Sequence, residues 1–143
     1  MIKKTLTYYD FNDQEVTEEL YFHLSSIELT RMIAKYDGDL EGYINKIVAA
    51  GDLMAMVNIL EDLLLSSYGV KSEDGRRFIK GPEVVNSFEW SQAYAELFET
   101  LLNNPKETRE FGIGLILSAK QQEELKDKIK QLPVDPSPKR ERT

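Results

Sequence analysis

The sequence predicts a mainly α-helical domain of the α+β class. An N-terminal β-hairpin precedes a compact bundle of about five to six helices, with a short hairpin or loop arm at 70–81. Three observations lead to this prediction. Apolar residues alternate over the first 24 residues, stripes with the helical spacing of three and four follow, and capping or turn residues separate the stripes. The 143 residues have the length of one domain with a short tail.

The hairpin is predicted from two runs with a period of two, which is the strand signal. A turn between them is expected at 11–14, where Phe-Asn-Asp-Gln supplies turn residues. Tyr9 and Phe11 lie opposite the alternating apolar residues, so we expect both faces of the hairpin to be partly covered. The inner face is expected to carry Ile2, Leu6 and Tyr8 from the first strand and Val16, Leu20, Phe22 and Leu24 from the second.

Three helices are expected between residues 26 and 68, each opened by a capping residue. Ser25 and Glu28 form a capping box, in which the hydroxyl accepts a free N–H of the first turn and the carboxylate returns the bond. Asp39 and Asp52 are placed to cap the next two helices. The expected inward residues are Ile27, Met32, Ile33, Tyr36, Leu40, Tyr43, Ile44, Ile47, Val48, Leu53, Met56, Val57, Leu60, Leu63 and Leu64.

Glycines are expected to end these helices, because glycine adopts the left-handed conformation of a C-terminal cap without steric cost. Asp37-Gly38 is expected to end the first helix and Gly51 the second. Gly69 is expected to end the third in a left-handed cap, with Val70 available for the accompanying apolar contact. Each of the three helices therefore has a predicted start and a predicted end.

Further helices are expected on the C-terminal side of the arm. Pro82 suits a first helical turn, and Asn86 or Ser87 is expected to interrupt that helix. A longer helix is predicted at about 91–103. Another is predicted from 106 through 117, where two glycines weaken the helical propensity.

The arm interrupts the helical pattern, and Asp74-Gly75 is typical of a tight turn. The run that follows it, Arg-Arg-Phe-Ile-Lys at 76–80, is basic with an aromatic residue inside. Three interpretations can be given for this run. In the first it is a hairpin arm with solvated arginines and a buried Phe78, and in the second the arginines contact an acidic neighbour such as another copy of the chain. The third, a nucleic-acid site, is disfavoured because it needs more positive charge than this acidic chain supplies.

The composition changes near residue 118, which predicts a domain at 1–118 and a further segment at 119–143. The net charge from residue 120 onward is +2, which leaves −9 for the preceding residues. This segment is expected to begin as a charged helix reaching about residue 132. A disordered tail is expected after it, because its prolines remove backbone donors and clash with a helical turn.

Composition and charge exclude several classes of function. The formal net charge of −7 disfavours binding to nucleic acid, since a phosphate backbone needs a basic footprint. No run of about 18 apolar residues is present, so no membrane partner or secretory signal is expected. The absence of cysteine excludes disulfides and thiolate catalysis, and a single histidine excludes a multi-histidine metal site.

The sequence shows no catalytic constellation, and no catalytic, cofactor-binding or metal-binding residue is expected. His23 lies close to Ser25 and Ser26, but sequence neighbours do not give triad geometry, so a strand histidine is the favoured interpretation. The weaker motifs are Asp10, Asp13 and Glu15, without the glycine and distal glutamate of a calcium loop; Gly112-Ile113-Gly114, without the third glycine of a dinucleotide site; and Lys71-Ser72, without the glycine-rich lead of a phosphate loop.

Residues 68–80, Tyr-Gly-Val-Lys-Ser-Glu-Asp-Gly-Arg-Arg-Phe-Ile-Lys, resemble a family signature, and the flanking segments agree with it. These are the strand at 1–5 with Tyr-Phe-His-Leu-Ser at 21–25, Phe88 with Ala-Tyr-Ala-Glu-Leu-Phe at 93–98, and Phe-Gly-Ile-Gly-Leu-Ile at 111–116. Over roughly residues 1–117 the chain resembles the tail assembly chaperones of long-tailed, siphovirus-type phages and prophages of Gram-positive bacteria. Ser-Ala-Lys at 118–120 departs from the proline-containing ending of that family.

This resemblance implies a role in the host cytoplasm before the phage tail exists, and absence from the mature virion. Such proteins bind the long, hydrophobic, helical tape measure protein and keep it soluble. They also help to recruit tail tube subunits, in many phages through a longer form made by a ribosomal frameshift. Coating a long partner favours many copies, and head-to-tail contacts that do not close produce a homo-oligomeric spiral or filament.

The arm is the expected contact between copies, reaching an acidic face of a neighbour. Together with the aromatic segment at 93–98 it supplies the hypothetical protein-interaction residues: Tyr68, Lys71, Ser72, Asp74, Arg76, Arg77, Phe78, Lys80, Tyr94 and Phe98. Two other function classes remain open. A small enzyme using His23 or a carboxylate pair predicts a pocket with strongly perturbed carboxylates. The second open class is a non-enzymatic regulatory or adaptor protein of another phage or host complex.

Overall fold

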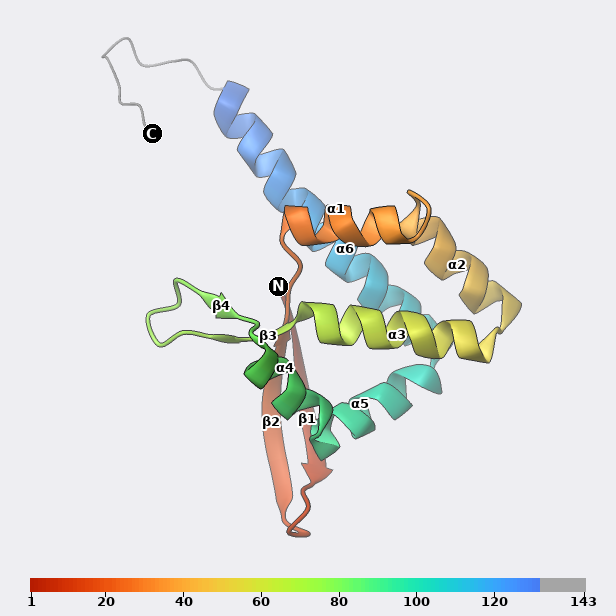
Figure 1. The fold of residues 1–143 in the computed structure, drawn as a ribbon, viewed down its shortest axis with the longest axis vertical. Coiled ribbons are helices and arrows are strands. Elements are labelled where there is room, and N and C mark those ends of the chain that lie inside the picture. Colours follow the sequence, from red (N-terminus) through yellow and green to blue (C-terminus); the bar gives the residue numbers. More distant parts are fainter. Residues whose placement is uncertain (132–143) are drawn as a thin grey trace.

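A four-stranded antiparallel sheet stands at one side of six helices in the computed structural model (Figure 1). The structure describes the backbone of residues 1–131 and the side chains of residues 1–121. In chain order the elements are β1 (Ile2–Tyr9), β2 (Glu15–Phe22), α1 (Ser26–Lys35), α2 (Leu40–Ala50), α3 (Leu53–Ser67), β3 (Tyr68–Lys71), β4 (Phe78–Ile79), α4 (Pro82–Glu89), α5 (Gln92–Leu102) and α6 (Pro105–Gln131). The predicted class, a hairpin followed by a helical bundle, is confirmed.

The strands lie in the order β1-β2-β3-β4, so the arm at 70–81 is a hairpin that continues the N-terminal sheet. In the first hairpin Ile2 pairs with Phe22, and in the link between the hairpins Phe22 pairs with Tyr68. In Figure 1 the arm projects away from the helices, and the turn of the first hairpin extends beyond α5. The arm is therefore anchored by backbone pairing at its base and free of the helical body at its tip.

The core lies between the inner face of the sheet and the helices. Phe22 is fully buried at its centre, and its ring makes edge contacts with Tyr68, Phe88 and Phe111. Helix α3 supplies the largest aliphatic share. The buried apolar residues are Leu20, Phe22, Leu24, Leu29, Met32, Leu40, Ile44, Ile47, Met56, Ile59, Leu60, Leu63, Leu64, Phe88, Ala93, Leu97, Leu101, Phe111, Leu115, Ile116 and Ala119.

The predicted capping residues open α1, α2 and α3. The Ser25 hydroxyl accepts the Glu28 N–H, and the Glu28 carboxylate accepts the Ser25 N–H, so both bonds of the capping box are present. The Asp39 and Asp52 carboxylates accept N–H groups of the first turns of α2 and α3. Gly51 ends α2 at φ +66°, as expected for a left-handed cap.

The predicted cap at Gly69 is wrong. Tyr68 ends α3 with extended backbone, and Gly69 lies in β3, paired with Tyr21 of β2. The physical reason is a close approach, because a Cβ at residue 69 would lie 2.5 Å from Cε2 of the Phe78 ring. Glycine is needed here for space and not for a positive φ.

Two other local predictions are wrong. Ile27 and Leu53, expected inside, are 63% and 60% exposed, because each lies in the first turn of its helix, beyond the packed body. Asn86 and Ser87 do not interrupt a helix, since α4 runs through both. The break comes instead at residues 90–91, where the Ser91 hydroxyl accepts the Tyr94 N–H and opens α5.

The helices expected at 106–117 and 120–132 form one continuous helix, α6. The expected domain boundary after residue 118 falls inside it, and Ala119 is fully buried in the core. The partition into 1–118 and 119–143 stays a prediction. The proline-rich tail expected at 133–143 lies outside the described residues.

Candidate functional site: the β3–β4 arm and the aromatic row at its base

Side-chain hydrogen bonds to the backbone fix the tip of the arm. The Ser72 hydroxyl donates to Oδ1 of Asp74 at 2.7 Å and accepts the Arg77 N–H at 3.0 Å. The same carboxylate oxygen accepts the Arg76 N–H at 3.0 Å. These bonds from Ser72 and Arg76 lower the pKa of Asp74. Gly75 completes the predicted turn at φ +73°. The hydrogen bonds of Ser72 and Asp74 therefore hold the shape of the arm.

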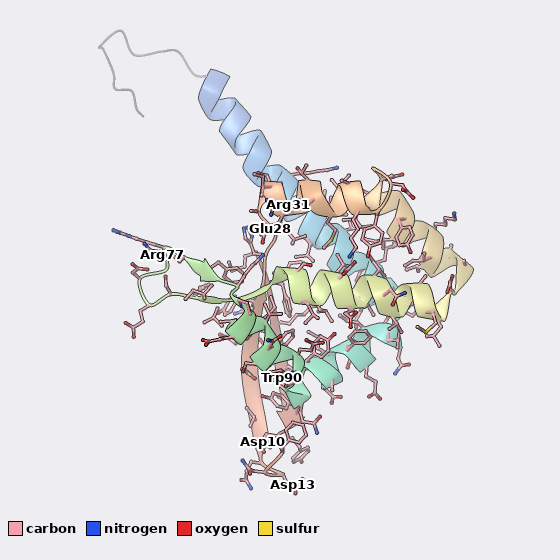
Figure 2. The ribbon with its side chains drawn as sticks, viewed as in Figure 1. Asp10, Asp13, Glu28, Arg31, Arg77 and Trp90 are labelled. Carbon is pink, nitrogen blue, oxygen red and sulfur yellow. The ribbon has the colours of Figure 1, made fainter. Side chains whose placement is uncertain are left out.

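Arg76 and Arg77 are presented to solvent by that turn. Both are exposed, and their side chains form no ion pair with any other residue in the described part of the chain. Figure 2 shows Arg77 at the outer end of the arm, pointing away from the body. The arm therefore carries two exposed positive charges on a domain whose overall charge is negative.

The two faces of the arm differ in their contacts. On one face Phe78 packs edge-on against the His23 ring at 5.9 Å, and Nζ of Lys71 lies 4.3 Å from the centroid of the Tyr21 ring. On the other face Val70 and Ile79 form a cross-strand pair and are 44% and 43% exposed. One face is held against the sheet, and the other presents an apolar pair beside the arginines.

Lys80 anchors the arm to the body. Its Nζ lies 2.8 Å from Oε1 of Glu28, and it also donates to the carbonyls of His23 and Ser66. These bonds join the end of β4 to the start of α1, the end of β2 and the end of α3. Burial lowers the pKa of Lys80, and the bond to Glu28 offsets this only in part. Lys80 is therefore a structural anchor and is not presented to solvent as Arg76 and Arg77 are.

Four aromatic side chains form a row that begins at the base of the arm. Tyr68 stacks on Phe88 at 3.9 Å between ring centroids, Phe88 meets Tyr94 edge-on at 5.1 Å, and Tyr94 meets Phe98 at 5.5 Å. The row links β3 to α4 and α5. Tyr68, Tyr94 and Phe98 are half-buried, so they present partial edges to solvent while packing against the core.

The structure thus brings the ten sequence-predicted residues together as two adjoining groups, which meet at Tyr68. The arm carries Lys71, Ser72, Asp74, Arg76, Arg77, Phe78 and Lys80, and the aromatic row carries Tyr68, Tyr94 and Phe98. Within the arm, the exposed arginines differ from the residues that hold its shape. The geometry is that of a projecting hairpin with a charged tip and an aromatic base, and the contact role of these residues stays a prediction.

A sequence-family model described as phage tail assembly chaperone matches residues 1–141. The chain belongs to this family. No match was found among curated proteins or among solved structures. The family membership confirms the resemblance to phage tail assembly chaperones and gives the protein a chaperone role in phage tail assembly, with protein partners in that process.

The carboxylates of this chaperone whose pKa shifts are resolved are held by hydrogen bonds within the fold. The carboxylates with resolved pKa shifts, Glu19, Glu28 and Asp74, are all shifted downward, chiefly by hydrogen bonds that outweigh burial. A general acid needs the opposite shift. Burial lowers the pKa of His23, and the Ser25 hydroxyl beside it is engaged in helix capping.

The described part of the chaperone contains no group of three or more acidic or histidine side chains arranged to hold a metal ion. None of its described helices is both long enough and apolar enough to span a membrane.

Sequence reasoning missed two features of the chaperone. Lys80 and Glu28 are 52 positions apart, and nothing in the local sequence indicates that they pair. Trp90, the single tryptophan, is 72% exposed between α4 and α5, and Phe11 is 75% exposed at the first turn. A tryptophan at a helix junction, bordered by glutamate and serine, is the signal that could have identified Trp90 as exposed.

Proposed function

We propose that this chaperone binds the tape measure protein of a long-tailed, siphovirus-type phage or prophage of a Gram-positive bacterium. It keeps that protein soluble in the host cytoplasm and helps to recruit tail tube subunits, directly or through a longer frameshifted form. It then leaves, so the mature virion lacks it. The protein acts by binding and not by catalysis.

The observation that carries this proposal is exposed apolar surface on an acidic domain. Trp90 and Phe11 are 72% and 75% exposed, and Leu53 and Met54 add a second exposed apolar pair where α3 begins. Aromatic residues and methionine are enriched at protein–protein interfaces relative to the rest of the surface. The charge of −9 on residues 1–119 opposes aggregation of the bound complex, as a chaperone for an apolar helical partner requires.

The arm supports a role in joining copies along a long partner. Arg76 and Arg77 extend from an acidic domain, and the exposed pair Val70 and Ile79 lies on the same hairpin. A contact from this arm to an acidic face of the next copy would be heterologous, so repetition would build a spiral or filament. Electrostatic complementarity of this kind sets register and orientation more than affinity.

Co-expression with the long helical protein encoded nearby tests the function. The partner is produced alone and with the tagged chaperone, and its soluble fraction and its capture on the tag are measured. The proposal expects an insoluble partner that becomes soluble and is captured when the chaperone is present. A partner that stays insoluble and uncaptured contradicts it. An unrelated acidic protein of similar size is the control for non-specific solubilisation.

A further inference from the structure

A small cleft lies between the outer half of the first hairpin and the junction of α4 and α5. It encloses about 140 Å³ and is lined by Tyr8 and Glu18 from the hairpin, Tyr68 from β3, and Ser87 and Ser91 from the junction. Sites for drug-sized ligands hold about 300–1,000 Å³. This cleft is therefore of a size for the end of one side chain and not for a cofactor.

The cleft has one charged group, the carboxylate of Glu18. Its Oε1 accepts the Tyr8 hydroxyl at 2.6 Å, and this bond raises the pKa of Tyr8 to about 12. Glu18 is exposed, and no lysine or arginine within the described side chains forms an ion pair with it. The carboxylate keeps acceptor capacity for a donor that enters the cleft from outside.

Trp90 is the sequence neighbour of the cleft-lining residue Ser91 and lies two residues after another, Phe88. Its side chain is 72% exposed. Tryptophan is enriched among the residues that dominate binding energy, so an exposed tryptophan next in the chain to the cleft is a candidate contact residue. An aromatic face also attracts a cation or packs against apolar side chains.

The charge around the cleft has one sign. Residues 8–20 and 87–93 supply every lining residue except Tyr68, and they contain six carboxylates and no lysine or arginine. One of the six, Glu19, is paired with Lys3. Figure 2 shows Asp10, Asp13 and Trp90 toward one end of the molecule and Arg77 toward another part. A cation approaching this end meets a favourable field, aromatic walls and the Glu18 carboxylate, which has acceptor capacity beyond its bond from Tyr8.

We propose that this cleft binds a lysine or arginine side chain from an apolar segment of a partner protein, with Glu18 as the ion-pair acceptor and Trp90 packing on the neighbouring apolar side chains. The inference names the chemistry of the partner segment and rests on the proposed binding function. The arm of a second copy fits less well, because Glu73 and Asp74 beside its arginines repel the cleft.

Trp90 provides the measurement, since its fluorescence reports binding next to the cleft without a label. The full chain is titrated with an amphipathic peptide of leucine and arginine and with the matched peptide of leucine and glutamate. We expect the arginine peptide to shift the emission and to bind at least about tenfold more tightly than the glutamate peptide. Glu18→Gln, which keeps an acceptor for Tyr8, is expected to weaken binding about tenfold. Glu99→Gln removes the same charge outside the cleft and is expected to have little effect.

Equal binding by Glu18→Gln and the wild-type chain overturns the inference, and so does an unchanged emission spectrum. Competition is the test for a second copy. The arginine peptide is added to the wild-type chain and to the Arg76→Glu/Arg77→Glu variant at rising protein concentration. If the arm of a second wild-type copy displaces the peptide, while the variant keeps it bound, the cleft holds another arm and the partner assignment fails. Co-expression separates the two proposals. If the Glu18→Gln variant captures the tail partner as well as the wild-type chain does, the inference fails and the proposed function stands. If the wild-type chain binds the arginine peptide but captures no tail partner, only the proposed function fails.

Discussion

The ring of Phe78 covers the backbone of Gly69, on the neighbouring strand of the arm, so closely that a Cβ at residue 69 would lie 2.5 Å from Cε2 of that ring. The ring in turn meets His23 at the end of β2. This contact packs the base of the projecting hairpin against the residue that follows β2. The position of the Phe78 ring therefore requires that residue 69 has no Cβ.

Gly69→Ala is expected to destabilise the protein by about 2 kcal/mol, because the added methyl group must displace the Phe78 ring. The free energy of unfolding from urea titrations measures this. Phe78→Ala removes the ring and provides the matched background. Adding Gly69→Ala to that background is expected to cost less than about 0.5 kcal/mol. Equal costs in both backgrounds would show that the contact does not determine the need for glycine.

Lys80→Met is expected to destabilise the protein by about 2 kcal/mol, because it leaves Glu28 and two backbone carbonyls without their shared donor. Lys3→Met is the matched control. It breaks an ion pair with Glu19 in which both side chains are about half exposed, and no measurable change is expected. Urea unfolding compares the two variants. Similar stabilities for both would contradict the role of Lys80 as the anchor.

Glu28→Gln tests the same anchor through pH. Burial opposes the charge on Glu28, but bonds from Lys80 and from Ser25 together lower its pKa below 4.5. Its contribution to stability is thus fully present above the unfolded pKa and is lost as pH falls through the lower folded value. Glutamine preserves the capping bond. We expect wild type to exceed the variant in unfolding free energy at pH 7, with the difference shrinking below about pH 4.5. A difference that does not change with pH would contradict this assignment.

Local chemistry explains what the sequence predicted correctly. Ser25, Asp39 and Asp52 were identifiable because an N-cap bond joins residues two or three positions apart, and the sequence displays that spacing directly. The alternation in the first hairpin was equally visible, since one face of the sheet is buried. The expected partial cover of the other face is wrong, because Tyr9 and Phe11 are 63% and 75% exposed. The candidate arm residues were found through their resemblance to a family signature, while their division into anchoring and exposed side chains required the structure.

Long-range contacts explain what the sequence did not predict. Gly69 follows a helix and so looks like a cap, but the ring that decides its role belongs to another strand. Lys80 looks like part of a basic run, but its partners lie on α1, β2 and α3. Trp90 has no periodic signal, because it lies at the end of α4, between that helix and α5. The roles of Gly69 and Lys80 depend on contacts between segments distant in the chain.

Reversal of both arm charges, Arg76→Glu with Arg77→Glu, is expected to reduce self-association at least about tenfold, because the arm would then repel an acidic neighbouring face. Neither guanidinium makes an ion pair with another described residue, so the folded monomer should keep its stability. Sedimentation velocity over a range of concentrations measures the change. Lys46→Glu, an exposed cation on α2, changes charge away from the arm and is the control. The same sedimentation profile for wild type and the double variant would exclude the arm as the contact. Equal losses in both variants would attribute the effect to net charge, since added negative charge weakens any association between acidic copies.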